Sequence, residues 1–343
     1  MNRRPKTYSA AAAETWEMLA GVIQAGQMLP PTELTAVNSL PLTVIGGFLG
    51  AGKTTLLNQL LSKPGGRKIA VLVNDFGRIN IDADLIQSRT MDTISLTNGC
   101  ACCTVAGDLT RVLIELASRT EPPDAIVLEA SGLADPRAIA QVALVNPALK
   151  LDGILSIIDA ETGFDRANDP DCRNTFCAQI GAADLIILNK LDLLDSTRQA
   201  AVREWLKAEW PDKAVVETVQ AVVPVDIALG IGTKRSSFSV SHHGHTKGFE
   251  SWSFTSDIPL DAGFLEQLLR DIPVSVLRVK AVLWLSNDLE YRTVYQRVGH
   301  RFSYSRGRAW NGETPSSSLV LIGLSGAVDI ENLEQAFQAC RVV

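Results

Sequence analysis

Residues 47–54 carry the spacing G-x-x-x-x-G-K-T, in which Lys53 and Thr54 directly follow a glycine. Glycine amides can turn toward phosphate oxygens, a lysine can neutralise their charge, and a threonine hydroxyl can ligate magnesium. An apolar segment precedes this motif and a helical pattern follows it, which disfavours a turn that binds nothing. We expect nucleotide contacts from Gly47, Gly50, Ala51, Gly52, Lys53, Thr54 and Thr55.

A second motif, NKLD, follows the apolar segment DLIIL and contains Asn189, Lys190 and Asp192. A carboxylate at this place can accept hydrogen bonds from the N1–H and exocyclic amine of guanine, which adenine does not present. The motif is short, but ligands of open α/β sheets bind at the carboxyl ends of strands. Asn189, Lys190 and Asp192 are therefore expected to bind the base, and GTP or GDP is favoured over ATP.

Between these motifs, the segment AIVLEASG ends in Glu129 and Gly132 with the spacing E-x-x-G. Such a carboxylate can hold magnesium, and the glycine amide can sense the γ-phosphate. We therefore assign Thr54 and Glu129 to Mg²⁺, and Lys53, Thr54 and Glu129 to catalysis; a solvated strand end is the alternative for Glu129. Residues 74–82, NDFGRINID, form a second candidate switch loop.

Three of the six cysteines, Cys100, Cys102 and Cys103, lie within the segment NGCACC. Core packing is disfavoured by the polar, turn-like flanks, and a disulfide between such close cysteines is strained. A catalytic nucleophile lacks an adjacent basic partner, whereas a redox switch stays open. Three thiolates suit a soft or borderline metal, with Zn²⁺ first and Co²⁺ as an alternative.

A three-thiolate site lacks the fourth protein ligand of a closed structural zinc centre. An open position suits an ion that is carried and handed over. Because the cysteines lie between the two candidate switch loops, nucleotide-dependent loop ordering could couple to metal affinity.

The elements that must position these residues alternate between strand and helix from residue 40 to about residue 230. Near-continuous apolar strands are expected at 41–47, 68–75, 125–131, 153–160 and 184–190, with helices at 54–62, 108–119 and 197–210. This pattern predicts an α/β fold, a mostly parallel P-loop sheet flanked by helices.

The chain of 343 residues divides into four predicted parts. Residues 1–39 form an N-terminal extension, 40–230 the P-loop GTPase domain, and 231–248 a polar linker. Residues 249–343 are predicted to form a smaller α+β domain with a mostly antiparallel sheet. Its expected strands are 250–257, 275–286, 291–305 and 317–324, and its expected helices are 260–272 and 330–342.

Composition restricts the function classes. A formal charge of −6 argues against nucleic acid as a partner, because nucleic-acid domains usually carry a basic face. No apolar run reaches the ~18 residues that span a bilayer, so no membrane partner is expected. The N-terminal segment starts basic but carries Glu14 and Glu17 where a secretory signal would need an apolar stretch, which argues against export. Reduced cysteines favour a cytoplasmic location.

Taken in order, GGFLGAGKTTLLN, VNDFG, NGCACC, EASGLADP, LNKLD and VLRVKAVLWL resemble the CobW-type GTPases of the CobW/HypB/UreG superfamily. The resemblance covers residues 41–343. It implies GTP hydrolysis, Mg²⁺ at Thr54 and Glu129, a transition metal at the CxCC thiolates, and delivery of that metal to a client metalloprotein.

This chain also departs from the family pattern. The acidic residues frequent near the first switch are partly replaced by Asp75, Arg78 and Ser95, which weakens the case for carboxylate metal ligands. The long histidine-rich stretch of many members is reduced to His242, His243 and His245, for which solvation competes with metal binding. Cys172, Cys177 and Cys340 are expected to be packing residues, and His300 has no evident partner.

The leading hypothesis is a GTP-hydrolysing metal chaperone with slow turnover, since no arginine finger or water-orienting residue can be named. A GTP-regulated metal or redox sensor that acts by partner binding is the alternative. A third hypothesis is a nucleotide-dependent assembly factor with structural cysteines. The sequence leaves open whether the chain forms a homo-oligomer.

Overall fold

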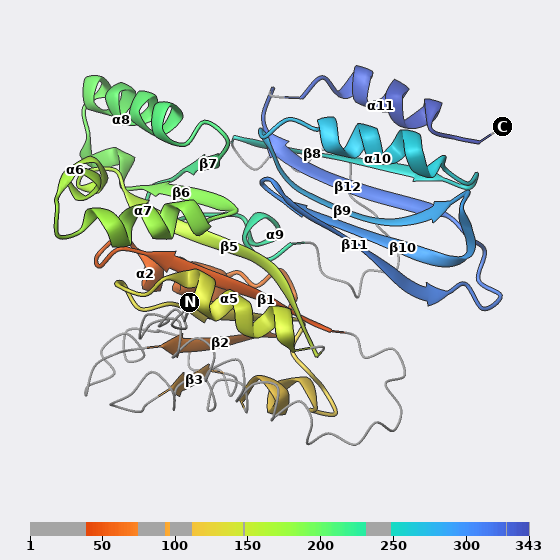
Figure 1. The fold of residues 1–343 in the computed structure, drawn as a ribbon, viewed down its shortest axis with the longest axis horizontal. Helices are drawn as coiled ribbons and strands as arrows, with labels where there is room; N and C mark the ends of the chain where they lie inside the picture. The colour runs from red at the N-terminus through yellow and green to blue at the C-terminus, as the bar shows by residue number, and fades with distance from the viewer. Residues whose placement is uncertain are drawn as a thin grey trace, which may run out of the picture.

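Two β-sheets of different kinds organise the protein (Figure 1). The computed structural model describes residues 39–74, 93–96, 112–146, 148–230, 248–326 and 328–342. The first sheet has seven strands in the order β3-β2-β4-β1-β5-β6-β7, and every neighbouring pair is parallel. Its strands are β1 (Leu40–Gly47), β2 (Ile69–Asn74), β3 (Thr93–Leu96), β4 (Ala125–Glu129), β5 (Leu149–Asp159), β6 (Leu185–Asn189) and β7 (Ala214–Glu217).

Helices cover both faces of this sheet, which explains its continuous apolar strands. Every residue of β4 and β6 is buried, as expected for strands covered on both sides. Helices α2 and α9 pack on one face, whereas α5, α6, α7, α8 and the helical residues 112–117 pack on the other. The bounds are α2 (Lys53–Ser62), α5 (Pro136–Val145), α6 (Gly163–Asn168), α7 (Arg173–Ala182), α8 (Ser196–Glu209) and α9 (Val225–Ala228).

Aspartate side chains fix where four helices begin. Asp135 and Asp195 accept hydrogen bonds from backbone amides in the first turns of α5 and α8. Asp261 and Asp329 do the same for α10 (Ala262–Asp271) and α11 (Ile330–Ala339). Such caps satisfy amides that have no partner within the helix, at about 1 kcal/mol each. The sequence therefore marks these helix starts locally.

The second sheet has five antiparallel strands in the order β11-β10-β9-β12-β8. Helices α10 and α11 pack against one of its faces through a core that includes Leu265, Phe337 and Cys340 (Figure 1). Its elements are β8 (Phe249–Ser256), α10 (Ala262–Asp271), β9 (Val276–Leu285), β10 (Asp288–Val298), β11 (Arg301–Ala309), β12 (Ser317–Leu324) and α11 (Ile330–Ala339). None of the helices in the described ranges is both long and apolar enough to cross a membrane.

The predicted fold class is confirmed, and the differences concern individual elements. No expected element corresponds to β3, β7, α5, α6 or α9, and β5 begins four residues earlier than expected. The expected strand 291–305 is wrong because it is two strands that meet at a turn through Gly299 and His300. Gly299 has φ +53°, and a Cβ atom there would lie 1.9 Å from the carbonyl oxygen of Asp184. Only glycine fits this close approach.

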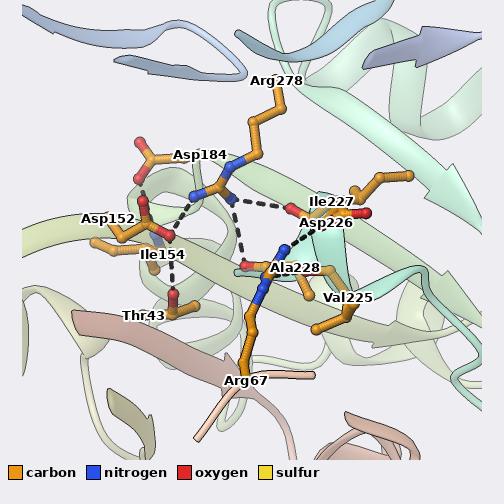
Figure 2. A network of polar contacts seen from close by, with 10 residues as sticks. All are labelled: Thr43, Arg67, Asp152, Ile154, Asp184, Val225, Asp226, Ile227, Ala228 and Arg278. Atoms are coloured by element: carbon orange, nitrogen blue, oxygen red, sulfur yellow. Dashed lines mark hydrogen bonds and ion pairs between the residues drawn. The ribbon is translucent and has the colours of Figure 1, made fainter. Parts of the chain in front are cut away.

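The two sheets are joined by shared apolar packing and by buried polar contacts. Leu277, Val298 and Ile322 of the second sheet belong to the core on the α2 face of the first. Arg278 on β9 pairs with Asp152 on β5 and donates hydrogen bonds to carbonyl oxygens of α9 (Figure 2). Because the Arg278 and Asp152 side chains are only 4% and 6% exposed, this ion pair lies inside the domain interface.

Candidate nucleotide-binding site

The P-loop lies between β1 and α2, and its glycines meet conformational demands that other residues do not. Gly47, Gly50 and Gly52 have φ angles of +139°, +77° and +114°. A Cβ atom at Gly47 would lie 2.5 Å from the Ile157 carbonyl oxygen, and one at Gly52 would lie 2.5 Å from Nδ2 of Asn189. The positive φ angles and these contacts explain the glycines of the motif.

Lys53 begins α2 with its side chain folded back over the loop. Its Nζ donates hydrogen bonds to the carbonyl oxygens of Gly47, at 3.1 Å, and Phe48, at 3.3 Å. Although the residue is only 7% exposed, its ammonium lies where a phosphate group would bring negative charge. Ala51, Gly52 and Thr55 occupy the loop and the first helical turn as expected.

Thr54 and Glu129 lie together although 75 residues separate them. The Thr54 hydroxyl donates a hydrogen bond of 3.5 Å to Oε1 of Glu129, which ends β4 beside β1. Glu129 is 2% exposed. Hydroxyl and carboxylate oxygens are ligands that Mg²⁺ accepts, so the donor set fits that ion.

Asn189 ends β6 and links two loops. Its Nδ2 donates to the Ala51 carbonyl oxygen at 2.9 Å, and its Oδ1 accepts from the Ala221 amide at 2.8 Å. Gln220 and Ala221 have φ angles of +53° and +52°, so the loop after β7 has an unusual conformation. Asn189 therefore positions the P-loop, and the Gln220–Ala221 loop joins the site without any signal in the sequence motifs.

The two charged residues of NKLD, Lys190 and Asp192, differ in their contacts and exposure. Lys190 has φ +64° and forms an ion pair of 2.7 Å with Asp159 at the end of β5. Asp192 lies in a short 3₁₀ helix, Leu191–Leu193, and is exposed. Its carboxylate is accessible to a base, whereas the Lys190 side chain is held against the sheet edge.

A glutamine that the motifs did not indicate supports the loop after β4. Gln179 on α7 is 1% exposed, and its Nε2 donates to the carbonyl oxygens of Gly132, at 3.0 Å, and Ala134, at 3.1 Å. The E-x-x-G loop is thus fixed from the neighbouring helix.

A second glutamine supports the NKLD loop in the same manner. Gln199 on α8 donates from Nε2 to the carbonyl oxygens of Leu191, at 2.9 Å, and Leu194, at 3.0 Å. In sequence both glutamines are ordinary helix residues. Only their contacts distinguish them.

Several predicted residues lie outside the described residues, namely Cys100, Cys102 and Cys103, most of the 74–82 loop with Asp75 and Arg78, His242, His243 and His245, and the extension 1–38. Ser95 lies in β3 opposite Val73. No group of three or more metal-ligating side chains occurs in the ranges that the structure does describe. Cys340 is buried, Cys172 and Cys177 are half-buried, and His300 is exposed.

Comparison with known protein families agrees with this arrangement. The model of the CobW/HypB/UreG nucleotide-binding domain matches residues 41–217. The chain belongs to this family. The cobalamin synthesis protein cobW C-terminal domain matches residues 249–341, so both sheets of this CobW family member have a counterpart.

Individual relatives of this CobW family member extend over most of its length. The chain is 33% identical to a zinc chaperone CobW from Sinorhizobium, over 83% of this chain and 93% of that protein. It is 30% identical to the zinc chaperone YjiA of Escherichia coli, over 89% of this chain and 100% of that protein. A zinc-regulated GTPase metalloprotein activator from Dictyostelium discoideum is 27% identical, over 76% of this chain and 66% of that protein.

Proposed function

We propose that the protein binds and hydrolyses GTP and carries Zn²⁺ to a client metalloprotein. One observation supports the nucleotide part most directly. The P-loop, Glu129 and Asn189 meet at the carboxyl edge of one parallel sheet, which is where open α/β sheets bind ligands. The names of the relatives support GTP as the nucleotide and zinc as the metal.

In this proposal, the P-loop residues Gly47, Gly50, Ala51, Gly52, Lys53, Thr54 and Thr55 bind the phosphates. Lys53 exchanges its carbonyl partners in the loop for phosphate oxygens and stabilises charge on the transferred group. Thr54 and Glu129 would hold Mg²⁺, which supplies further positive charge beside the β- and γ-phosphates when bound. Water then attacks the γ-phosphate, and GDP and phosphate result.

We further assign base recognition to the NKLD edge. The exposed Asp192 carboxylate accepts hydrogen bonds from N1–H and the exocyclic amine of guanine. Asn189 holds the P-loop next to this base site through its hydrogen bond to the Ala51 carbonyl oxygen. Lys190 and its ion pair with Asp159 form one wall of the base site.

Nucleotide titration in Mg²⁺ tests this assignment. We expect GTP and GDP to bind, GTP to be hydrolysed slowly, and ATP to compete weakly. A matched variant, Lys53→Met, keeps the side-chain length and removes the charge, so hydrolysis should be abolished. Equal binding of ATP and GTP, or no hydrolysis of either, contradicts the proposal.

For the metal, we propose that Cys100, Cys102 and Cys103 bind Zn²⁺ as cargo in a site that changes with the nucleotide. Zinc titrations of the wild type and of Cys102→Ser, each with GDP and with a non-hydrolysable GTP analogue, test this. We expect one site that Cys102→Ser weakens strongly, with different affinities in the two nucleotide states. Equal affinities would leave zinc binding intact and exclude the coupling.

A further inference from the structure

A pocket lies between the two domains, away from the nucleotide edge. It has a volume of about 350 Å³ and is lined by residues 149–152 at the start of β5, 296–298 at the end of β10, and 301–303 at the start of β11, with Ala143. This volume falls within the range of small-molecule sites, ~300–1,000 Å³. Ile157, near the other end of β5, pairs with Gly47 of the P-loop, so the pocket and the nucleotide site lie at opposite edges of the sheet.

The β-strand register places two hydrogen-bond donors that line the pocket, and a third on the adjacent strand, on one face of the second sheet. Ser303 pairs with Gln296, and Gln296 pairs with Lys280 on β9. Residues directly opposite in antiparallel strands share a face, so a hydroxyl, an amide and an ammonium form a row across three strands. Val298, two residues after Gln296, packs in the core shared with the first domain, so this face is turned toward that domain.

Two cations add positive charge to the pocket, Lys150 from the opposite side and Arg301 from the same strand as Ser303. Lys150 on β5 makes no hydrogen bond or ion pair within the part of the chain that the structure describes. Arg301 bonds to Asp184 through Nε at 2.8 Å, and its side chain is 35% exposed, which leaves the terminal nitrogens of the guanidinium available.

The neighbouring carboxylates are already engaged. Asp152 accepts from Arg278 and, at 3.2 Å, from Thr43 (Figure 2). Asp184 accepts from Arg301 and, at 2.8 Å, from the Ile154 amide. The pocket is therefore rich in donors and cations, while its acceptors are already used.

Burial of Lys150 and Lys280 lowers the pKa of both ammonium groups. Desolvation lowers the pKa of Lys150 and lowers the pKa of Lys280 to about 8, although Asp152 opposes both shifts. An anion in the pocket would supply acceptor oxygens to Lys150 and to the terminal nitrogens of Arg301, and it would add negative charge beside Lys280.

We propose that the interdomain pocket binds a small oxyanion, a phosphate or carboxylate group of a small molecule, through Lys150, Arg301, Gln296 and Ser303. Lys280 contributes positive charge from the adjacent strand. The site is separate from the P-loop, and its ligand contacts both domains. Binding there stabilises the packing of the second sheet on the first.

Isothermal titration of the full-length protein with inorganic phosphate tests the site. GDP and Mg²⁺ are first added to saturation, so that the P-loop is occupied, and sodium chloride at equal ionic strength serves as the blank. A second arm uses citrate. Stronger binding of phosphate identifies a phosphorylated ligand, and stronger binding of citrate identifies a carboxylate ligand; either result supports an oxyanion site.

Matched variants locate the binding. Lys150→Gln should weaken it about tenfold or more, the loss expected for a hydrogen bond to a charged group, whereas Lys150→Arg should retain it. Lys207→Gln, at an exposed lysine on α8, should bind as the wild type. Unchanged GTP hydrolysis by Lys150→Gln shows that this variant is folded. Absence of saturable binding of both anions, or wild-type binding by Lys150→Gln, overturns the proposal.

Discussion

At the scale of single residues, the polar side chains of the site have two roles. Some are placed to bind a ligand, and others hold the loops in position. The side-chain amide of Asn189 forms hydrogen bonds with the backbone of Ala51 and Ala221, and Lys190 forms an ion pair with Asp159. Asp192 alone among the NKLD polar residues is exposed. Discrimination between bases is therefore expected to depend on the Asp192 carboxylate. Asn189 and Lys190 hold the surrounding loops in place.

Asp192→Asn should change the preferred base from guanine to xanthine. The substitution replaces one acceptor oxygen by an amide donor, and xanthine carries a carbonyl where guanine carries its amine. We expect the affinity for GDP to fall about 10- to 100-fold, the cost of losing a hydrogen bond to a charged group. Competition titrations with GDP and XDP measure this.

Asp212→Asn is the matched control, because Asp212 is an exposed aspartate in the turn before β7. It should leave both affinities unchanged. If Asp192→Asn binds GDP as the wild type does, the base is recognised by another residue.

At the scale of elements, two helices position the two loops of the nucleotide edge by the same device. Gln179 on α7 bonds to two carbonyl oxygens of the E-x-x-G loop, and Gln199 on α8 bonds to two of the NKLD loop. Each neutral hydrogen bond contributes ~1 kcal/mol. We therefore expect α7 to affect the hydrolysis step beside Glu129 and α8 to affect binding of the base beside Asp192.

The two glutamines allow a crossed experiment. Gln179→Leu should lower kcat for GTP hydrolysis by up to about 30-fold with little change in GDP affinity, because two bonds of ~1 kcal/mol each position the loop beside Glu129. Gln199→Leu should weaken GDP binding with a smaller effect on kcat. Steady-state kinetics and GDP titrations of both variants measure the two effects. Identical profiles for the two variants would show only general destabilisation.

How much of these elements could be predicted varied with the range of the interactions. The apolar strands were predicted from the sequence, because a strand covered on both faces is a continuous run of apolar residues. β3 and β7 are four residues each and carry little periodicity. The turn at Gly299 depends on the Asp184 carbonyl oxygen in the other domain, which no local pattern indicates.

At the scale of the whole molecule, the interface between the domains holds a buried ion pair, Arg278 with Asp152. Arg278 is 4% exposed and connects Asp152 on β5 with the carbonyl oxygens of Ile227 and Ala228 on α9 (Figure 2). α9 follows the loop that contains Ala221, the partner of Asn189. The second domain is therefore attached near an element that borders the nucleotide site.

Arg278→Met should destabilise the protein by about 3–5 kcal/mol, because it leaves the buried Asp152 carboxylate without its main partner. Urea denaturation followed by circular dichroism measures this loss. Arg306→Met is the matched control, since the Arg306 side chain is exposed and its ion pair with Asp288 should contribute little to stability. Equal losses in the two variants would contradict a special role for the buried pair.

Lys280 should make stability depend on alkaline pH. Burial, with Arg278 nearby, lowers its pKa from 10.5 to about 8. Between about pH 8 and 10.5 the unfolded chain binds the proton that the folded chain has released, so the free energy of unfolding rises with pH in this window and is lowest below it. Lys280→Met should flatten this rise, whereas Lys207→Met should not. Urea midpoints between pH 7 and 10.5 measure the slope, and an equal slope in wild type and Lys280→Met excludes the effect.

By itself, the sequence determined the α/β class, the P-loop and the NKLD edge, because apolar strand patterns and motif spacing are local properties. Only the tertiary structure decided that Asn189 braces two loops, that Gln179 and Gln199 hold their carbonyl oxygens, and that a donor-rich pocket lies between the domains. The hydrogen bonds among these features join residues between 5 and 138 positions apart, and the pocket brings together residues as distant as Ala143 and Ser303. Such contacts are fixed by how sheets and helices pack, and the packing is set by the whole chain rather than by any one segment.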